Sequence, residues 1–313
     1  MAPTLPLELQ LFVIDLALPP LTRKSLAELS ELMKTWTLVD RAWHAYLVAK
    51  VPVVPRLVLR EDERDVAAFE RFREVVEAAG RVVEHCELDM RRWKGEILEG
   101  HHLKNALRRY KTAWVDLPWT PCTWPLEHLA GLTRLSMNDD LHEEPPTLAT
   151  SVNARLEHVA LTCVDLADVD LNGAHIKSIL FNKCYRIDSQ IFSAGFPSLE
   201  VLGIVATFAG EAVLAASATL PPSLRHVLIS LDVNPSVLLA HVTFPPTLDT
   251  LTIRHRADTS SRTKTAALSP LVEADLAHVR QACAASNTVF TVIEAPEDDS
   301  AFDLEAWALS VGG

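Results

Sequence analysis

Residues 199–204 read LEVLGI and residues 224–229 read LRHVLI, two copies of the spacing apolar-x-x-apolar-x-apolar. We assign nine copies of this spacing between residues 54 and 253, at intervals of 20 to 29 residues. The last apolar position of each copy is Leu59, Leu88, Leu117, Met137, Leu161, Phe181, Ile204, Ile229 and Ile253. The core-type residue two positions earlier is Leu57, Cys86, Val115, Leu135, Val159, Ile179, Leu202, Val227 and Leu251. Short strands repeated at such intervals predict a solenoid, because each repeat can bury its apolar side chains only against its neighbours.

The first two intervals are the longest, at 29 residues each. Within the first, Val66, Phe69, Phe72 and Val76 recur at helical spacing, and Gly80 follows as a helix terminator. The later intervals leave too little chain for long helices, so we expect short helical turns or irregular arcs there. The array is therefore predicted to begin with a strand, a helix and a second strand.

The later copies share a signal directly before the strand. It is a tripeptide in matching register, Pro197-Ser198-Leu199, Pro222-Ser223-Leu224 and Pro246-Thr247-Leu248. Proline favours an extended conformation in the residue before it, which suits a chain that leaves an outer arc and enters a strand. Beyond residue 256 the spacing changes, and we expect a helix over residues 270–286 and a last strand over residues 289–293.

This order of strands and helices resembles leucine-rich repeats. The resemblance implies an α/β fold with parallel strands on a concave face and helices and loops outside. Cys163 and Cys184 stand where such repeats normally carry an Asn or Cys after the strand. We predict an irregular leucine-rich-repeat solenoid over residues 51–295.

Two other segments carry aromatic residues. The tail, residues 296–313, is acidic and then apolar at Phe302, Leu304 and Trp307, and we expect it to fold back as a terminal cap. Residues 118–125 read PWTPCTWP. Its two Trp residues favour either a substrate contact, since exposed Trp is a strong interface anchor, or a cover over the place where the interval shortens.

Residues that alternate with the core positions point to the concave face. They are polar, mixed in sign and interspersed with a few apolar residues, which suits a protein or peptide ligand better than a polyanion. The candidate substrate-binding residues are Trp114, Asp116, Arg134, Ser136, His158, Ser178, Asn182, His226 and Arg254. The alternative for each is an ordinary solvated strand face.

Residues 4–50 contain only helical patterns. Pro6 suits the first turn of a helix, and Pro19-Pro20 ends it. Ser25 and Glu28 have the spacing of a capping box at the start of a second helix, and a third helix follows. One interpretation is a small helical cap over the exposed edge of the first repeat, which solenoids require.

The same region resembles an F-box, whose usual pattern opens with Leu-Pro-x-Glu-Leu and closes with Leu-Val-Cys/Ser-x-x-Trp. The matching segments are Leu5-Pro6-Leu7-Glu8-Leu9, Val13-Ile14-Asp15-Leu16 and Leu38-Val39-Asp40-Arg41-Ala42-Trp43. The chain is most similar to divergent fungal F-box proteins in which repeats follow at once. It departs from the pattern at Asp40, in place of Cys or Ser, and in a longer segment between Leu16 and Leu38.

The resemblance implies docking of residues 1–50 on the Skp-type adaptor of a cullin-type (SCF) ubiquitin ligase. The residues expected to face the adaptor are Leu5, Pro6, Leu9, Ile14, Leu38, Val39 and Trp43. The solenoid would then hold a protein substrate. The alternative is a leucine-rich-repeat binding scaffold without a ligase link, with some of these residues, Trp43 above all, packed inside the three helices.

Composition narrows the function further. The 313 residues carry a net charge of −12, which disfavours nucleic-acid binding because phosphate contacts need clustered Lys and Arg. No apolar run approaches the roughly 18 residues of a membrane span, and the N-terminus lacks the features of a secretory signal. Five scattered cysteines do not suggest a disulfide framework, so we expect a cytoplasmic or nuclear protein. Phosphate-loop, hydrolase-elbow and zinc motifs are absent from the sequence, and we expect no enzyme activity, cofactor or metal.

Overall fold

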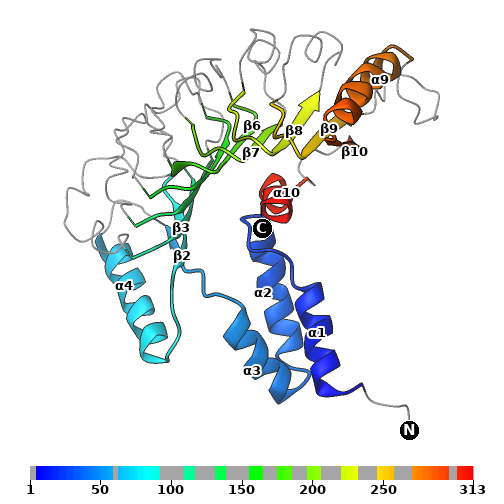
Figure 1. Ribbon diagram of the computed structural model, residues 1–313. Helices are drawn as coiled ribbons and strands as arrows, with labels where there is room; N and C mark the ends of the chain where they lie inside the picture. Colours follow the sequence, from blue (N-terminus) through cyan, green and yellow to red (C-terminus); the bar gives the residue numbers. More distant parts are fainter. Residues whose placement is uncertain are drawn as a thin grey trace, which may run out of the picture.

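The computed structural model describes residues 5–58, 63–91, 109–116, 131–138, 155–164, 175–184, 196–205, 220–231, 245–256, 270–295 and 302–312. Its strands form a curved sheet, with three N-terminal helices beyond one end of the curve and the last helix inside it (Figure 1). The segment 118–125, for which two interpretations were open, lies outside the described residues.

The sheet has ten strands, all parallel and in the order of the sequence. They are β1 (Arg56–Val58), β2 (His85–Asp89), β3 (Thr112–Asp116), β4 (Arg134–Asn138), β5 (His158–Thr162), β6 (Ser178–Asn182), β7 (Val201–Val205), β8 (His226–Leu231), β9 (Thr250–Arg256) and β10 (Val289–Ala295). Each strand pairs only with its neighbours in sequence, which is the arrangement of a solenoid. The α/β class and the solenoid architecture are thus confirmed.

One face of every strand from β1 to β9 belongs to a single continuous core. Leu88, Phe181 and Val227 on this face are fully buried. The predicted alternation of core and concave positions is therefore right, because successive side chains of a strand point to opposite faces.

The register differs from the prediction in the first and third copies. Leu57, not Leu59, lies opposite Leu88, and Leu88 in turn lies opposite Val115, not Leu117. Both predicted positions fall outside the described residues. Alternation cannot separate two registers that differ by two residues, because such a shift keeps every side chain on the same face.

The Pro-Ser/Thr-Leu tripeptides each lie directly before a strand, as predicted, and the first two residues of each form a turn. Their hydroxyl groups join successive repeats: Ser223 Oγ donates to the carbonyl of Leu199 at 2.8 Å, and Thr247 Oγ1 donates to that of Pro222 at 2.6 Å. The leucines of the tripeptides are buried. The motif thus combines a turn, a hydrogen bond to the preceding repeat and a core residue.

Only one of the two cysteines singled out after the strands contributes to the core. Cys184 is buried, and its thiol donates to the carbonyl of Leu161 at 3.2 Å. Cys163 adopts a left-handed conformation with φ 58°, as Lys183 does at the same place in the next repeat with φ 54°. Cys163 is therefore a turn residue, and Val164 takes the core position that Cys184 has in the next repeat.

Two long helices lie on the outer side of the described sheet (Figure 1). The predicted first one is α4 (Glu63–Ala78), with Val66 and Phe69 buried in the core and Gly80 after its end at φ 78°. The second is α9 (Pro270–Ala285), which packs beside β10. Both confirm the helices expected at the start and the end of the array.

The N-terminal region forms three helices, α1 (Leu7–Ala17), α2 (Ser25–Trp36) and α3 (Arg41–Lys50). They enclose a small core of their own around Ile14, Leu29 and Leu47. Isolated helices of 10 to 12 residues are marginal in water, so this core holds them together.

Two helix starts differ from simple expectation. The reciprocal bonds of a capping box join Thr22 and Ser25, not Ser25 and Glu28: the Ser25 amide donates to Thr22 Oγ1 at 3.2 Å, and the Thr22 amide donates to Ser25 Oγ at 2.9 Å. The capping residue is therefore Thr22, three residues before the Ser25 that the sequence spacing suggested. Asp40 caps α3, accepting from the Ala42 amide at 2.6 Å, which explains a carboxylate at this position of the F-box-like pattern.

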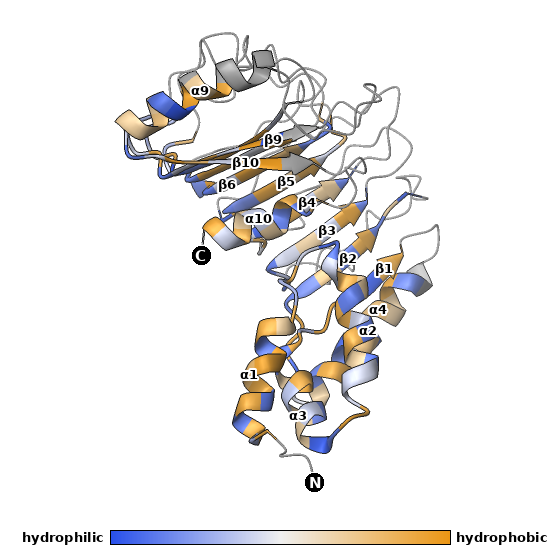
Figure 2. Ribbon diagram, turned by 90° about the vertical axis from the view of Figure 1, so that its right-hand side faces the viewer, coloured by the Kyte–Doolittle hydropathy of each residue, from blue (hydrophilic) through white to orange (hydrophobic). Residues whose placement is uncertain are grey.

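The tail forms α10 (Leu304–Val311), with Asp303 as its N-cap. It does not cover the last strand as a terminal cap. It lies instead across the concave face, against β6 and β7 (Figures 1 and 2).

Candidate functional site

The parallel strands arrange the concave side chains in three rows that cross the sheet. The first row is His85, Thr112, Arg134, His158, Ser178, Val201, His226 and Thr250; the second is Glu87, Trp114, Ser136, Ala160, Leu180, Gly203, Leu228 and Thr252; the third is Asp89, Asp116, Asn138, Thr162, Asn182, Val205, Ser230 and Arg254. All nine candidate substrate-binding residues lie in these rows. The face is polar at its edges and becomes apolar in the second row, over β5 to β8.

The apolar part of the second row is the seat of α10. Leu180 and Leu228 form a small cluster there with Leu304 and Ala308 of the helix, separate from the solenoid core. Leu228 is fully buried. A sheet residue that faces the concave side is therefore covered by the chain itself.

Gly203 lets the helix approach the sheet. A Cβ atom at this position would lie 2.9 Å from Leu304 Cδ1 and 2.9 Å from Leu180 Cδ2, closer than van der Waals contact allows. Glycine weakens the interior of a strand, and it often marks a place where another element comes close. The sequence carried this signal, but the prediction did not assign Gly203 to the site.

Glu305, in the first turn of α10, is bound by two of the predicted substrate-binding residues. Arg134 Nη2 donates to Glu305 Oε2 at 2.8 Å, and Trp114 Nε1 donates to the same oxygen at 3.2 Å. Arg134 also donates to the carbonyl of Leu21 at 3.1 Å and lies 5.9 Å from the Trp114 ring centroid. Trp114 is fully buried beside α10, so in this arrangement it is not an accessible substrate contact.

The segment between α1 and α2 meets the tail at the same place. Arg23 forms an ion pair with Asp116, a predicted substrate-binding residue that is buried. Thr22 Oγ1 donates to Asp303 Oδ2 at 2.5 Å, and Lys24 Nζ donates to the Phe302 carbonyl. We call these contacts, with those of Arg134 and Trp114, the tail junction. These residues belong to the stretch from Leu16 to Leu38, which is longer than in the usual F-box pattern, and that stretch thus has a structural role.

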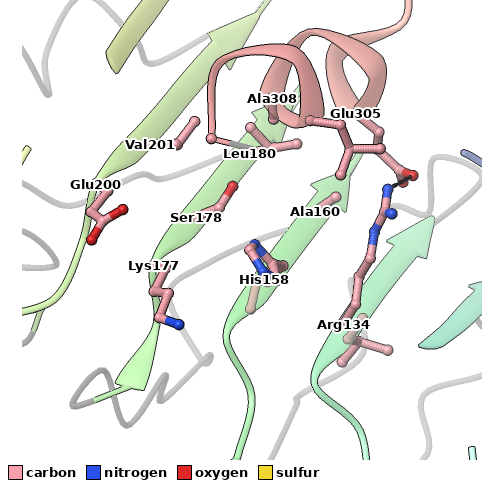
Figure 3. Close-up of a pocket in the computed structure, with 14 residues that line it drawn as sticks. Arg134, His158, Ala160, Lys177, Ser178, Leu180, Glu200, Val201, Glu305 and Ala308 are labelled. Carbon is pink, nitrogen blue, oxygen red and sulfur yellow. Dashed lines mark hydrogen bonds and ion pairs between the residues drawn. The ribbon is translucent and has the colours of Figure 1, made fainter. Parts of the chain in front are cut away.

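Two cavities remain beside α10. One, of about 180 Å³, is bounded on the sheet side by Arg134, His158, Lys177, Ser178 and Glu200 and on the helix side by Ala308, Leu309 and Gly312 (Figure 3). The other, of about 340 Å³, is bounded by Arg23, Lys24, Ser136, Asn138, Thr162 and Asn182 and by the start of α10. The helix therefore does not fill the concave face.

The remaining predicted substrate-binding residues lie around these cavities or beyond them. Ser136 and Ser178 are buried, and His158 and Asn182 are half-buried at the cavity walls. Arg254 is fully buried, with its guanidinium carbon 4.9 Å from the ring centroid of Phe302. His226 is half-buried, and its Nδ1 lies 2.9 Å from Thr250 Oγ1. The structure therefore gathers Arg134, Ser136, His158, Ser178 and Asn182 near α10, whereas Arg254 and His226 lie farther along the sheet.

The histidines of the first row resist protonation. The pKa of His158 lies below its ordinary value, mainly because burial disfavours the charged ring, and the positive charge of Arg134 adds to this. Burial likewise lowers the pKa of His85 and His226. A neutral imidazole can donate one hydrogen bond and accept another, which suits a polar protein ligand.

These shifts predict a loss of stability in mild acid. A histidine with a lowered folded pKa binds more protons when unfolded, so its stabilisation is fully present above about pH 6.5, the unfolded pKa, and is lost as the pH falls from there through the lower folded pKa. We expect the urea concentration at the midpoint of unfolding to be lower at pH 5.5 than at pH 7.5. In His158→Asn this difference between the two pH values should be smaller. The carboxyl pKa values of Asp89 and Glu157 are also lowered, so their contribution to stability is lost only at a pH below this range. A midpoint that stays constant over this range would contradict the prediction.

The N-terminal helices expose a second surface. Leu5, Pro6, Leu9, Leu38 and Val39, all predicted to face the adaptor, are exposed. The start of α1 and the turn between α2 and α3 lie at the same end of the module, away from the sheet (Figures 1 and 2).

Two of the predicted adaptor-facing residues lie inside the module instead. Ile14 is 2% exposed and belongs to the core, so its assignment to the surface is wrong. Trp43 is half-buried; its Nε1 donates to Gln10 Oε1 at 2.9 Å, and its ring packs edge-on against Trp36. The prediction missed exposed Leu7, Phe12, Val13 and Leu16 of α1, which the helical period could have shown.

Comparisons with family models, with curated proteins and with solved structures find no match for this chain. Among the helices that the structure describes, none has the length and hydropathy to cross a membrane. Within the same residues, His, Cys, Asp and Glu side chains form no group of three that could hold a metal ion.

Proposed function

We propose that this chain is a substrate-recognition adaptor of a cullin-type ubiquitin ligase. Helices α1 to α3 bind the Skp-type adaptor, and the concave face of the solenoid binds a protein substrate. Catalysis belongs to other subunits, and this chain contributes proximity and orientation. Such a protein works in the cytoplasm or the nucleus.

The observation that carries the proposal is the exposed apolar surface of the N-terminal helices. On α1, Leu9, Phe12, Val13 and Leu16 are more than half exposed and share one helical face. Leu38, in the turn after α2, is 85% exposed. Clustered apolar side chains of this kind mark protein interaction sites. All of them except Phe12 lie in the segments that resemble an F-box.

The attachment of the helices to the solenoid also supports this role. Arg23 pairs with Asp116 of β3, and Arg81 Nη2 donates to the carbonyl of Val51 at 2.7 Å. Arg134 of β4 adds the bond to Leu21. These contacts, from the segment between α1 and α2 and from the residue after α3, fix the sheet-facing end of the helical module to the solenoid. A fixed attachment holds a bound substrate in a constant orientation to the ligase, which favours transfer.

A second candidate is a leucine-rich-repeat binding scaffold without a ligase. Burial of Ile14 and half-burial of Trp43 favour it, because part of the F-box-like pattern then serves only to hold the helices together. In that case the exposed face of α1 would bind a partner of another kind. Capture by the Skp-type adaptor separates the two functions.

We expect Leu38→Asp combined with Val39→Asp to reduce capture by a purified Skp-type adaptor at least tenfold. The two substitutions remove apolar side chains from the interface and bring two carboxylates into it, which must lose water. Together these effects should weaken the binding free energy by more than about 1.4 kcal/mol, which corresponds to tenfold. The control is Val75→Asp with Val82→Asp, which are 69% and 72% exposed but lie on or near α4. The measurement is pull-down followed by isothermal titration calorimetry.

Circular dichroism must show that both double variants remain folded. The control variant should bind the adaptor as the native chain does. A native chain that is folded and is not captured would refute the ligase proposal and leave the scaffold. Unchanged capture by the Leu38→Asp/Val39→Asp variant would show that binding does not involve the turn after α2.

A further inference from the structure

We infer that the concave face over β5 to β8 is a docking site for a short amphipathic helix of a partner protein, and that α10 occupies it until the partner displaces it. The inference specifies the substrate class in the proposed function. It rests on the role of the solenoid as the binding surface and not on adaptor docking by α1 to α3.

The way in which α10 is seated defines the kind of ligand. Leu304, Ala308 and Val311 lie at i, i+4 and i+7 on one side of the helix, and they pack on the apolar second row. Helices that bind in grooves present anchors at this spacing. Gly203 and the short side chain of Ala160 leave room for a helix at that place.

Charge specifies the start of the ligand helix. Glu305 in the first turn of α10 binds Arg134, and the carboxylate of Asp303 caps the helix and accepts from Thr22. Arg23 and Lys24 line the cavity at this end. A partner helix should therefore begin with acidic residues, which also suit the positive end of its dipole.

The internal helix has little stability of its own. It has eight residues, too few for a helix that is stable by itself. Of its residues only Leu304 and Ala308 are buried, and Leu309 is 41% exposed. Its docking therefore depends on a small apolar contact and on the tail junction.

The site is also larger than its occupant. The cavity of about 180 Å³ borders Ala308 of the helix and Gly312 directly after it, two residues with little or no side chain (Figure 3). A partner helix with a larger aliphatic side chain at the place of Ala308 can bury more apolar surface there. More buried surface gives tighter binding, so such a helix should displace α10.

The test uses full-length chains and a fluorescein-labelled peptide of residues 302–312. Leu304→Asp releases α10 and leaves the site open. Gly203→Leu should also release α10 but fill the site, because its Cβ atom alone would lie 2.9 Å from side-chain atoms of both Leu304 and Leu180. Circular dichroism checks the fold, and fluorescence anisotropy measures peptide binding.

We expect the Leu304→Asp chain to bind the peptide at least tenfold more tightly than the native chain does, because the internal competitor is gone. The Gly203→Leu chain should not bind it. A peptide that itself carries Leu304→Asp should fail with every chain. Equal binding of the peptide to the native and the Leu304→Asp chains would overturn the proposal, as would equal binding to the Gly203→Leu chain.

Displacement is tested on the native chain with a peptide that carries Ala308→Leu. We expect this peptide to bind at least fivefold more tightly than the native peptide and to expose the bond after Glu305 to endoproteinase Glu-C. Mass spectrometry detects the released residues 306–313. If no peptide exposes Glu305 while the Leu304→Asp chain is cut there, α10 is a permanent part of the fold and the proposal fails.

Two further outcomes are distinguishable. Sedimentation velocity over about 1 to 100 μM measures whether the native chain dimerises. Dimerisation would assign the site to α10 of a second copy and would overturn the proposal of a separate partner protein. Adaptor capture is measured on the same chains. Loss of capture with normal peptide binding would count against the ligase and not against the helix site.

Discussion

Replacing Phe181 with alanine should lower the free energy of unfolding by about 3–5 kcal/mol. The ring is fully buried in the solenoid core, where Phe181 lies opposite Leu161 on one side and Ile204 on the other. Both neighbouring strands are fixed by backbone hydrogen bonds, so the core cannot close around the missing ring. Urea denaturation followed by far-ultraviolet circular dichroism measures the change.

The matched control is Asn182→Ala on the same strand. Asn182 is half-buried on the concave side, where its side chain borders a cavity, and its loss should change the free energy of unfolding by less than about 0.5 kcal/mol. Similar losses for Phe181→Ala and Asn182→Ala would show that the two faces of β6 contribute equally. That result would contradict the assignment of one face to the core.

The faces of the sheet could be predicted because they depend on local alternation. Val159 and Leu161 point to the core and His158 to the concave side in any register that differs by an even number of residues. The register itself depends on how whole repeats stack. For this reason Leu59 and Leu117 satisfied the sequence pattern equally well, although the strands pair through Leu57 and Val115.

The partners of the concave residues could not be predicted in the same way. Trp114 and Glu305 are 191 residues apart in the chain, and their hydrogen bond exists only because α10 crosses the sheet. Alternation places Trp114 on the concave side but says nothing about what covers it. Gly203 was the available local signal, since a glycine within a strand indicates the close approach of another element.

The tail junction connects the two proposed binding surfaces. Thr22 and Lys24 bind the tail, whereas Arg23 binds Asp116 of the sheet and Leu21 accepts a bond from Arg134. The contacts to the sheet do not need α10. The helical module therefore stays attached to the solenoid when the tail leaves, and the distance between the adaptor surface and the substrate surface is kept.

Replacing Glu305 with alanine should increase local opening of α10 by more than a hundredfold. Arg134 and Glu305 form a largely buried ion pair, and removal of one member of a fully buried pair costs about 3–5 kcal/mol because the other charge remains desolvated. Arg134 and Glu305 are 17% and 12% exposed at their side chains, and Trp114 Nε1 also loses its acceptor. Since α10 can detach, the loss appears as opening of the tail and not as unfolding of the sheet.

Hydrogen exchange of residues 304–311, followed by mass spectrometry, measures this opening, because exchange reports the free energy of local unfolding. Glu305→Gln keeps an oxygen that can accept from Trp114 and Arg134, so its effect should be smaller. When Arg134→Met is already present, Glu305→Ala leaves no arginine charge without its partner. Glu305→Ala should then add little to the opening, because the effects of two residues in one ion pair are not additive. Unchanged exchange in Glu305→Ala would mean that the apolar contacts of Leu304 and Ala308 alone hold α10 on the concave face.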